Sequence, residues 1–156
     1  MKQEDVAEAV AGILVERELM LGTVECGVAG AVSRRLFNTA EGPLVLGNSL
    51  VVEEPAEAIT IMELPRPQFK KAGEFSMKAA RAGARQGCAF LGVQISLAIW
   101  GQGPTLEESL LQPLYLAVDG GRQRAERTVQ VVNEEALAQH ALTLVWEVVE
   151  AKRSDW

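Results

Sequence analysis

The chain is poor in the residues from which metal and redox sites are usually built. Its 156 residues include one histidine, His140, and two cysteines, Cys26 and Cys88. With one histidine and no second cysteine near either thiol, the usual zinc ligand sets cannot be assembled. Two cysteines also make no disulfide framework of the secreted kind, which favours a reduced, cytoplasmic protein. We therefore expect neither a metal site nor a cofactor, and metal chemistry based on carboxylates alone stays an open alternative.

Positive charge is also scarce. Fifteen Lys and Arg stand against 21 Asp and Glu, which gives a formal net charge of −6. The basic residues occur in short groups, at 34–35, 70–71 and 122–127. Nucleic acid and anionic membranes require clustered Lys and Arg, so neither is an expected partner.

Long apolar runs are missing as well. No run reaches the length needed to cross a bilayer, and the opening MKQEDVAEAV has acidic residues where a signal peptide would be apolar. What the chain does have is 48% hydrophobic residues against 23% charged residues, as in globular proteins. At this length we expect one domain over residues 1–156.

The hydrophobic pattern predicts helices alternating with strands. Expected helices cover residues 3–20, 27–36, 55–62 and 75–86, with a last helix beginning near Asn133; expected strands cover 21–25, 44–52, 90–100, 114–118 and 124–132. We expect 44–52 and 90–100 to be buried strands and the last two strands to form a hairpin around Gly120-Gly121. This order predicts an α/β fold, a mixed sheet with helices on both faces.

The most apolar expected strand, 90–100, gives a sharper prediction. Because side chains alternate along a strand, one face should carry Val93, Ile95, Leu97 and Ile99, and the other Gln94, Ser96 and Ala98.

A first site candidate is TVECGVAGAV at 23–32, where small residues surround one glutamate and one thiol. A strand ending at Cys26 and followed by glycines places backbone amides at a helix N-terminus, where they can hold an anion or an oxyanion. A thiol at that place also has a reason to be more acidic than usual. In the alternative interpretation, which the pattern alone favours, Cys26 is a small apolar filler in a tightly packed turn.

A second candidate is WGQGP at 100–104, which follows the most apolar strand. Loops that leave strand ends are where α/β sheets bind ligands. The loop lacks the lysine and hydroxyl residue of a phosphate loop. Trp100 has two interpretations, a platform that stacks on a ligand ring or a cap on the core.

The blocks from Thr23 to Leu36, LVLGNSLVV, FLGVQISLAIWGQGP and PLYLAV together resemble the C-terminal domain of the competence/damage-inducible protein CinA, over roughly residues 5–150. That family includes nicotinamide mononucleotide amidohydrolases. The resemblance implies a three-layer helix-sheet-helix sandwich with a mixed β-sheet in a single domain.

The resemblance also carries site residues. The family motif Glu-Ser-Cys-Thr-Gly-Gly, whose serine is the proposed nucleophile, falls on residues 25–30, with Cys26 at the serine. The family's tyrosine and lysine fall on Val52 and Glu57. By this resemblance Cys26 is the candidate catalytic residue, and the candidate ligand-binding residues are Glu25, Gly27, Val28, Ala29, Gly30, Trp100, Gly101, Gln102 and Gly103.

Two functions follow. In the first, the domain has lost the amidohydrolase activity and binds a nucleotide-like small molecule or a partner protein. In the alternative, it is an active amide hydrolase on nicotinamide mononucleotide or a related amide, with Cys26 as nucleophile and the amides of Gly27–Gly30 as oxyanion hole. We favour the first, because a lysine-to-glutamate change reverses the charge where an anionic substrate would sit. We expect Cys26 to lie at a strand-to-helix turn beside a pocket shaped by Gly27–Gly30 and Gly101–Gly103, without being an efficient nucleophile.

A third possibility is an oligomeric structural or regulatory subunit with no small-molecule role. A homo-oligomer is expected in any case, with Trp100, Trp146 and Trp156 as possible interface anchors.

Overall fold

The structure, a computed structural model, describes residues 5–102 and 112–152, in which helices alternate with strands. The helices are α1 (Val6–Glu16), α2 (Ala31–Phe37), α3 (Gly42–Val45), α4 (Pro55–Ile61), the 3₁₀ turn η1 (Arg66–Phe69), α5 (Met77–Leu91) and α7 (Glu134–Lys152). The strands are β1 (Leu21–Cys26), β2 (Leu46–Val52), β3 (Ile95–Trp100), β4 (Leu114–Asp119) and β5 (Arg124–Val129).

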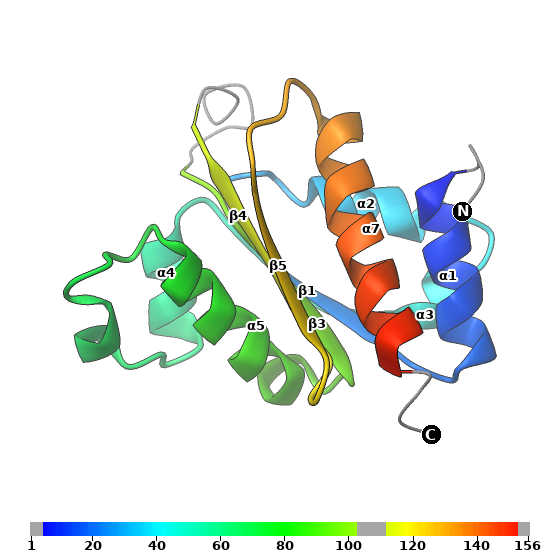
Figure 1. Ribbon diagram of the computed structural model, residues 1–156, viewed down its shortest axis with the longest axis horizontal. Coiled ribbons are helices and arrows are strands. Elements are labelled where there is room, and N and C mark those ends of the chain that lie inside the picture. The colour runs from blue at the N-terminus through cyan, green and yellow to red at the C-terminus, as the bar shows by residue number, and fades with distance from the viewer. Residues whose placement is uncertain (1–4, 103–111, 153–156) are drawn as a thin grey trace.

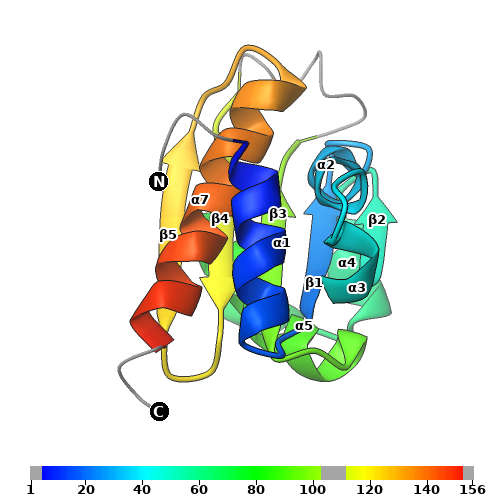
Figure 2. The ribbon, with the colours of Figure 1, turned by 90° about the vertical axis from the view of Figure 1, so that its right-hand side faces the viewer.

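The strands form one mixed sheet in the order β2-β1-β3-β4-β5. β1 pairs in parallel with β2 and β3, whereas β3–β4 and β4–β5 are antiparallel. Helices α1, α2, α3 and α7 lie on one side of the sheet, and α4 and α5 lie on the other (Figure 1). Figure 2 looks onto the first of these sides, where α1 and α7 cross in front of the strands. The three-layer α/β fold expected from the sequence is therefore confirmed.

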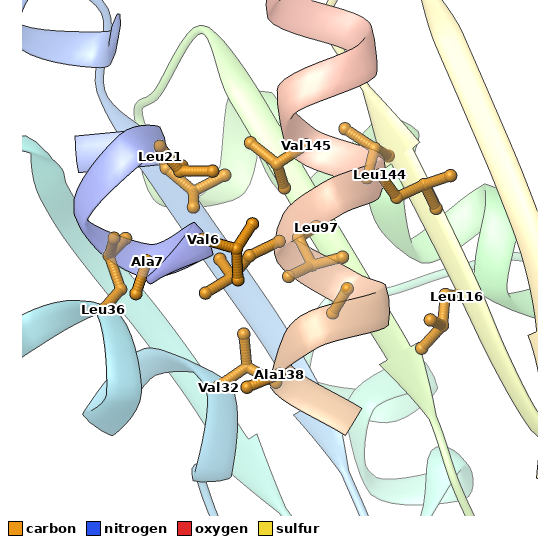
Figure 3. Packing of buried hydrophobic residues seen from close by; sticks show 14 of the residues in the cluster. Val6, Ala7, Leu21, Val32, Leu36, Leu97, Leu116, Ala138, Leu144 and Val145 are labelled. Atoms are coloured by element: carbon orange, nitrogen blue, oxygen red, sulfur yellow. The ribbon is translucent and has the colours of Figure 1, made fainter. Parts of the chain in front are cut away.

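Each side of the sheet has its own apolar core. The larger core packs α1, α2 and α7 onto alternate strand residues such as Leu21, Leu97 and Leu116 (Figure 3). The smaller core lies under α4 and α5. It contains the strand residues that alternate with those of the larger core, such as Val24, Ala98 and Ala117. This alternation is what a strand buried on both faces requires.

Two strand predictions need correction. Residues 90 and 91 belong to α5, because Ala84, Gly87 and Leu91 repeat at helical spacing on its buried face; the helix then ends at Gly92, which has φ +70°. Val93 therefore precedes β3 and packs in the smaller core, while Ile95, Leu97 and Ile99 face the larger one as expected.

The strand expected to be buried at 44–52 is in fact an edge strand. β2 starts at Leu46 and is only partly covered, with Val51 47% exposed. Its apolar composition suggested a central strand, but only the sheet order decides which strands have neighbours on both sides. The last helix begins as expected, since Asn133 Oδ1 accepts a hydrogen bond of 2.8 Å from Ala136 N.

The N-terminal end of α1 is held by a carboxylate. Asp5 caps the helix, accepting a hydrogen bond of 3.0 Å from Ala7 N, and forms an ion pair with Arg35 of α2. Burial alone would raise the pKa of Asp5, but the bonds from Arg35 and Ala7 outweigh it and lower that pKa below the usual value. The cap thus ties α1 to α2.

No helix within residues 5–102 and 112–152 combines the length and apolar composition needed to cross a membrane.

Candidate functional site

The candidate site centres on the turn between β1 and α2. β1 ends at Cys26 and α2 begins at Ala31, so the strand-to-helix location expected for Cys26 is confirmed. Gly27 and Gly30 have φ of +79° and +73°, and Ala29 has φ of +54°. This region favours glycine, because a Cβ there costs on the order of 1–2 kcal/mol. Ala29 occupies a position where the resembled motif has glycine.

Glu25 points from β1 toward α2 and is fully buried. Its Oε1 accepts a hydrogen bond from Val32 N at 3.0 Å, and its Oε2 accepts one from Ser33 N at 3.0 Å. Oε2 also accepts a bond of 3.0 Å from the Thr23 hydroxyl, which lies 2.7 Å from Ser49 Oγ.

Val32 and Ser33 are in the first turn of α2, where amides have no partner within the helix. A carboxylate there satisfies these donors and faces the positive end of the helix dipole. The anion-binding end of α2 is therefore occupied by a side chain of the protein itself.

Two amides of the expected site are engaged in backbone hydrogen bonds. Gly27 N donates to Val52 O at 3.0 Å, and Gly101 N donates to Cys26 O at 2.8 Å. A Cβ on Gly101 would lie 2.7 Å from Cys26 O, so only glycine permits this approach. An oxyanion hole requires donors aimed at the reacting oxygen, and the N–H of Gly27 is aimed into the sheet instead.

Cys26 lies on the opposite face of β1 from Glu25, because side chains alternate along a strand. It is fully buried in the smaller core, which includes Val24, Ala58, Ile59, Ala98 and Trp100. Burial, reinforced by the negative charges of Glu25 and Glu57, raises the pKa of the Cys26 thiol far above its ordinary value. The thiol is therefore protonated at neutral pH, and only the thiolate is an effective nucleophile.

The positions matched to the family's tyrosine and lysine do lie near Cys26. Val52 pairs with Cys26 across β1 and β2, and Glu57 is close enough to act on the thiol's pKa. Val52 has no proton to donate, whereas Glu57 belongs to a capping box in which its Oε1 accepts a bond of 3.2 Å from Glu54 N. Val52 therefore cannot act as a proton donor, and the negative charge of Glu57 favours the protonated thiol instead of stabilising a thiolate as a lysine would.

Trp100 belongs to the core. Its side chain is fully buried, and its indole Nε1 donates to Glu74 O at 2.7 Å. A Cβ on Gly83 of α5 would lie 2.6 Å from the ring, so helix and ring are in direct contact. In this conformation Trp100 offers no face to a ligand. Gly101 is buried and Gln102 is exposed, while Gly103 lies outside the described residues.

Two cavities stand out in the described part of the chain, and neither reaches Cys26 or residues 27–30. One of about 770 Å³ lies between α5 and the β4–β5 hairpin. Another of about 370 Å³ lies between α2 and β2. One cation does reach the turn, since the guanidinium of Arg34 donates to Ala29 O and lies 3.4 Å from the Glu134 carboxylate.

Sequence reasoning missed the hydrogen-bonding role of Glu25. Thr23 and Glu25 share one strand face, a spacing visible in the sequence, but their partners on α2 and β2 are fixed only by the fold. The Glu54–Glu57 capping box had a local signal, a carboxylate three residues after the cap residue. Within residues 5–102 and 112–152, no group of three or more His, Cys, Asp or Glu is placed to hold a metal ion.

Comparisons with known proteins agree with this fold. The family model described as CinA C-terminal domain matches residues 3–144. No curated protein matches the chain significantly.

Among solved structures, the competence or damage-inducible protein from Enterobacter asburiae is similar with a TM-score of 0.75 and 17% identity, over 94% of this chain and 95% of that one. A CinA superfamily protein from Enterobacter cloacae gives a TM-score of 0.77 at 17% identity, over 94% and 89%. The competence/damage inducible protein CihA from Agrobacterium tumefaciens gives 0.75 at 15% identity, over 93% and 96%. At these identities the likeness is one of fold.

Proposed function

This chain belongs to the CinA C-terminal domain family, and from that premise we propose that it is a member without amidohydrolase activity that binds a nucleotide-like small molecule. The proposed binding place is the carboxyl edge of β1 and β3, where the turn at 27–30 and the segment after Trp100 meet. Open α/β sheets bind ligands at this edge. A partner protein at the same edge is the second form of the proposal.

The observation that carries the loss of activity is the environment of Cys26. Cysteine hydrolases activate the thiol with a base or a cation, and they give a proton to the departing nitrogen. Burial and the negative charges of Glu25 and Glu57 all raise the pKa of Cys26, and they therefore favour the protonated thiol. Val52 and Glu57 replace the family's tyrosine and lysine, so no proton donor stands at either position.

Arg34 supports the binding role. Its guanidinium already contacts the Ala29 carbonyl, and its pair with Glu134 is loose, at 3.4 Å with both side chains 54% exposed. Such a pair is worth at most about 1 kcal/mol. A ligand phosphate can therefore replace Glu134 at little cost and keep Arg34 at the turn.

The test is a titration with nicotinamide mononucleotide followed by two-dimensional NMR. We expect amide shifts at Gly27–Gly30, Gly101 and Gln102, and no formation of nicotinate mononucleotide. Arg34→Ala should weaken binding at least about tenfold, since a charge-assisted bond is lost. Arg122→Ala, which removes an exposed arginine in the β4–β5 turn, is the control and should leave binding unchanged. The absence of any shift at these amides would contradict the nucleotide-binding form and favour a partner protein.

Self-association is part of the proposal, but through other residues than the tryptophans. Trp100 is buried and Trp146 packs against the larger core, while Trp156 lies outside the described residues. Exposed apolar side chains occur instead at Val51 of the edge strand β2, 47% exposed, and at Phe37 at the end of α2, 53% exposed. Sedimentation should give an oligomer that Val51→Lys weakens, and a monomer at high concentration would refute it.

A further inference from the structure

The cavity of about 770 Å³ lies on the α5 side of the sheet, away from the candidate site. β5 is the edge strand there, and it follows β4 in the order of the sheet. α5 packs mainly over β3 and β4, whereas α7 covers β5 from the other side (Figure 1). A groove therefore remains between α5 and the β4–β5 hairpin. Asp119, which lines it, pairs with Ser96 near the start of β3, so the groove lies toward the opposite end of the strands from Cys26.

The floor and walls of this groove come mainly from α5, β4 and β5, with Leu64, Pro65 and Gln68 from the segment around η1 completing the lining. Alternation along the hairpin turns Ala117 and Asp119 of β4, and Arg124 and Glu126 of β5, toward α5. The residues that α5 contributes are Arg81, Ala82, Ala84, Arg85 and Gln86. Small alanine side chains at the base leave the volume open, and cavities of roughly 300–1,000 Å³ are typical of small-molecule sites.

The charges in the groove do not balance. Arg81 Nε lies 2.7 Å from Glu126 Oε2, and Arg124 Nε lies 3.0 Å from Asp119 Oδ2. The guanidinium of Arg85 has no hydrogen bond or ion pair to any of the residues that the structure describes. One guanidinium is therefore left over in the groove, although the whole chain carries a formal charge of −6.

The position of Arg85 is unfavourable for the isolated chain. Arg81 and Arg85 stand four residues apart on α5, and like charges at this spacing lie on the same helix face and destabilise the helix. Glu126 neutralises Arg81 alone. A bound anion would neutralise Arg85 in the same way.

We propose that this groove binds a small organic anion, with its phosphate or carboxylate group held by Arg85 and its apolar body lying over the alanine floor. The planar guanidinium matches either group with two parallel hydrogen bonds. Phosphate and carboxylate share this chemistry, and the experiment separates them. The proposal does not depend on the function proposed for the β1–α2 turn.

The experiment uses phenyl phosphate and benzoate as probes, titrated into the ¹⁵N-labelled chain up to about 10 mM. We expect shifts at Ala117, Val118 and Arg85 with at least one probe, and the tighter probe identifies the preferred group. Arg85→Ala should weaken binding at least about tenfold, and Arg85→Lys should restore part of it. Lys71→Ala removes the same charge from an exposed residue outside the lining and should leave affinity unchanged.

Three results would overturn the proposal. One is the absence of groove shifts with either probe. Another is equal weakening by Arg85→Ala and Lys71→Ala, which indicates general charge attraction. The last is a set of NMR shifts at the groove amides that changes with protein concentration and not with probe concentration. That result would indicate that a second copy of the chain covers the groove. Arg85 is exposed, so the variant should fold, and its circular dichroism melt verifies this.

Discussion

Replacing Glu25 with glutamine separates a structural role for this residue from a ligand-binding one. The substitution keeps the size of the side chain but turns one acceptor oxygen into an NH₂ group. Glu25 now accepts from Val32 N and Ser33 N on different oxygens, both at 3.0 Å, so one amide must lose its acceptor. Both the side chain and these bonds are buried, which makes the loss costly.

The expected cost follows from two effects. A buried donor left without a partner costs about 1–3 kcal/mol, and the lost charge at the helix terminus adds about 0.3–1 kcal/mol. We expect Glu25→Gln to lower the free energy of unfolding by about 1–4 kcal/mol. For a chain of this length the melting temperature should fall by on the order of 3–15 °C.

The assay is urea unfolding at pH 7, followed by far-UV circular dichroism. Glu53→Gln makes the same chemical change at an exposed glutamate and should alter stability by less than about 0.5 kcal/mol. A Glu25→Gln protein as stable as the Glu53→Gln control would refute the reasoning. If such a stable Glu25→Gln protein had also lost affinity for nicotinamide mononucleotide, Glu25 would be a ligand-binding residue and not a structural acceptor for the amides of α2.

Three further predictions concern the thiol, the helix packing and the N-cap. In a Cys88→Ala background, iodoacetamide should modify native Cys26 at least about 100-fold more slowly than it modifies the urea-unfolded chain, because the buried thiol must be exposed first; similar rates would contradict this. Gly83→Ala should destabilise the protein by about 1–3 kcal/mol, because the new Cβ clashes with the Trp100 ring. In the control Gly12→Ala the new Cβ would lie 3.6 Å from the nearest atom, Glu41 Oε1, so the better helix former should stabilise the protein by about 0.5–1 kcal/mol. Asp5→Asn keeps a good cap but loses the charge, so it should cost up to about 1 kcal/mol at pH 7. The pKa of Asp5 is lowered in the folded protein, so the stability that its charge contributes is lost as the pH falls from about 4 through that lowered pKa. The difference in unfolding free energy between wild type and Asp5→Asn should therefore vanish in acid, and a full difference at pH 2 would contradict this prediction.

The sequence was a good guide to elements and a weaker guide to their surroundings. Alternation within β3 identified the residues that face the larger core, because a central strand repeats with period two. It failed at Phe90, where an apolar pair continues a helix, and at β2, whose edge position depends on the order of the strands.

The candidate site divides in the same way. The motif located Cys26 correctly at a turn, since glycines and a preceding strand are local signals. The burial of Trp100 includes a hydrogen bond to the backbone carbonyl of Glu74, and the network around Glu25 extends through Thr23 to Ser49 on β2; both partners lie 26 residues away in the sequence. No spacing along the chain could reveal these contacts.

The central claim, that the family fold persists here without amide hydrolysis, is tested most directly by incubating the wild-type chain with nicotinamide mononucleotide and measuring release of ammonia. We predict no release above the rate without protein at any pH from 6 to about 9, because a thiol with a strongly raised pKa stays protonated throughout. Cys26→Ala serves as the matched variant and should be indistinguishable from wild type. Steady ammonia release by wild type that disappears in Cys26→Ala would contradict the account and identify Cys26 as a working nucleophile.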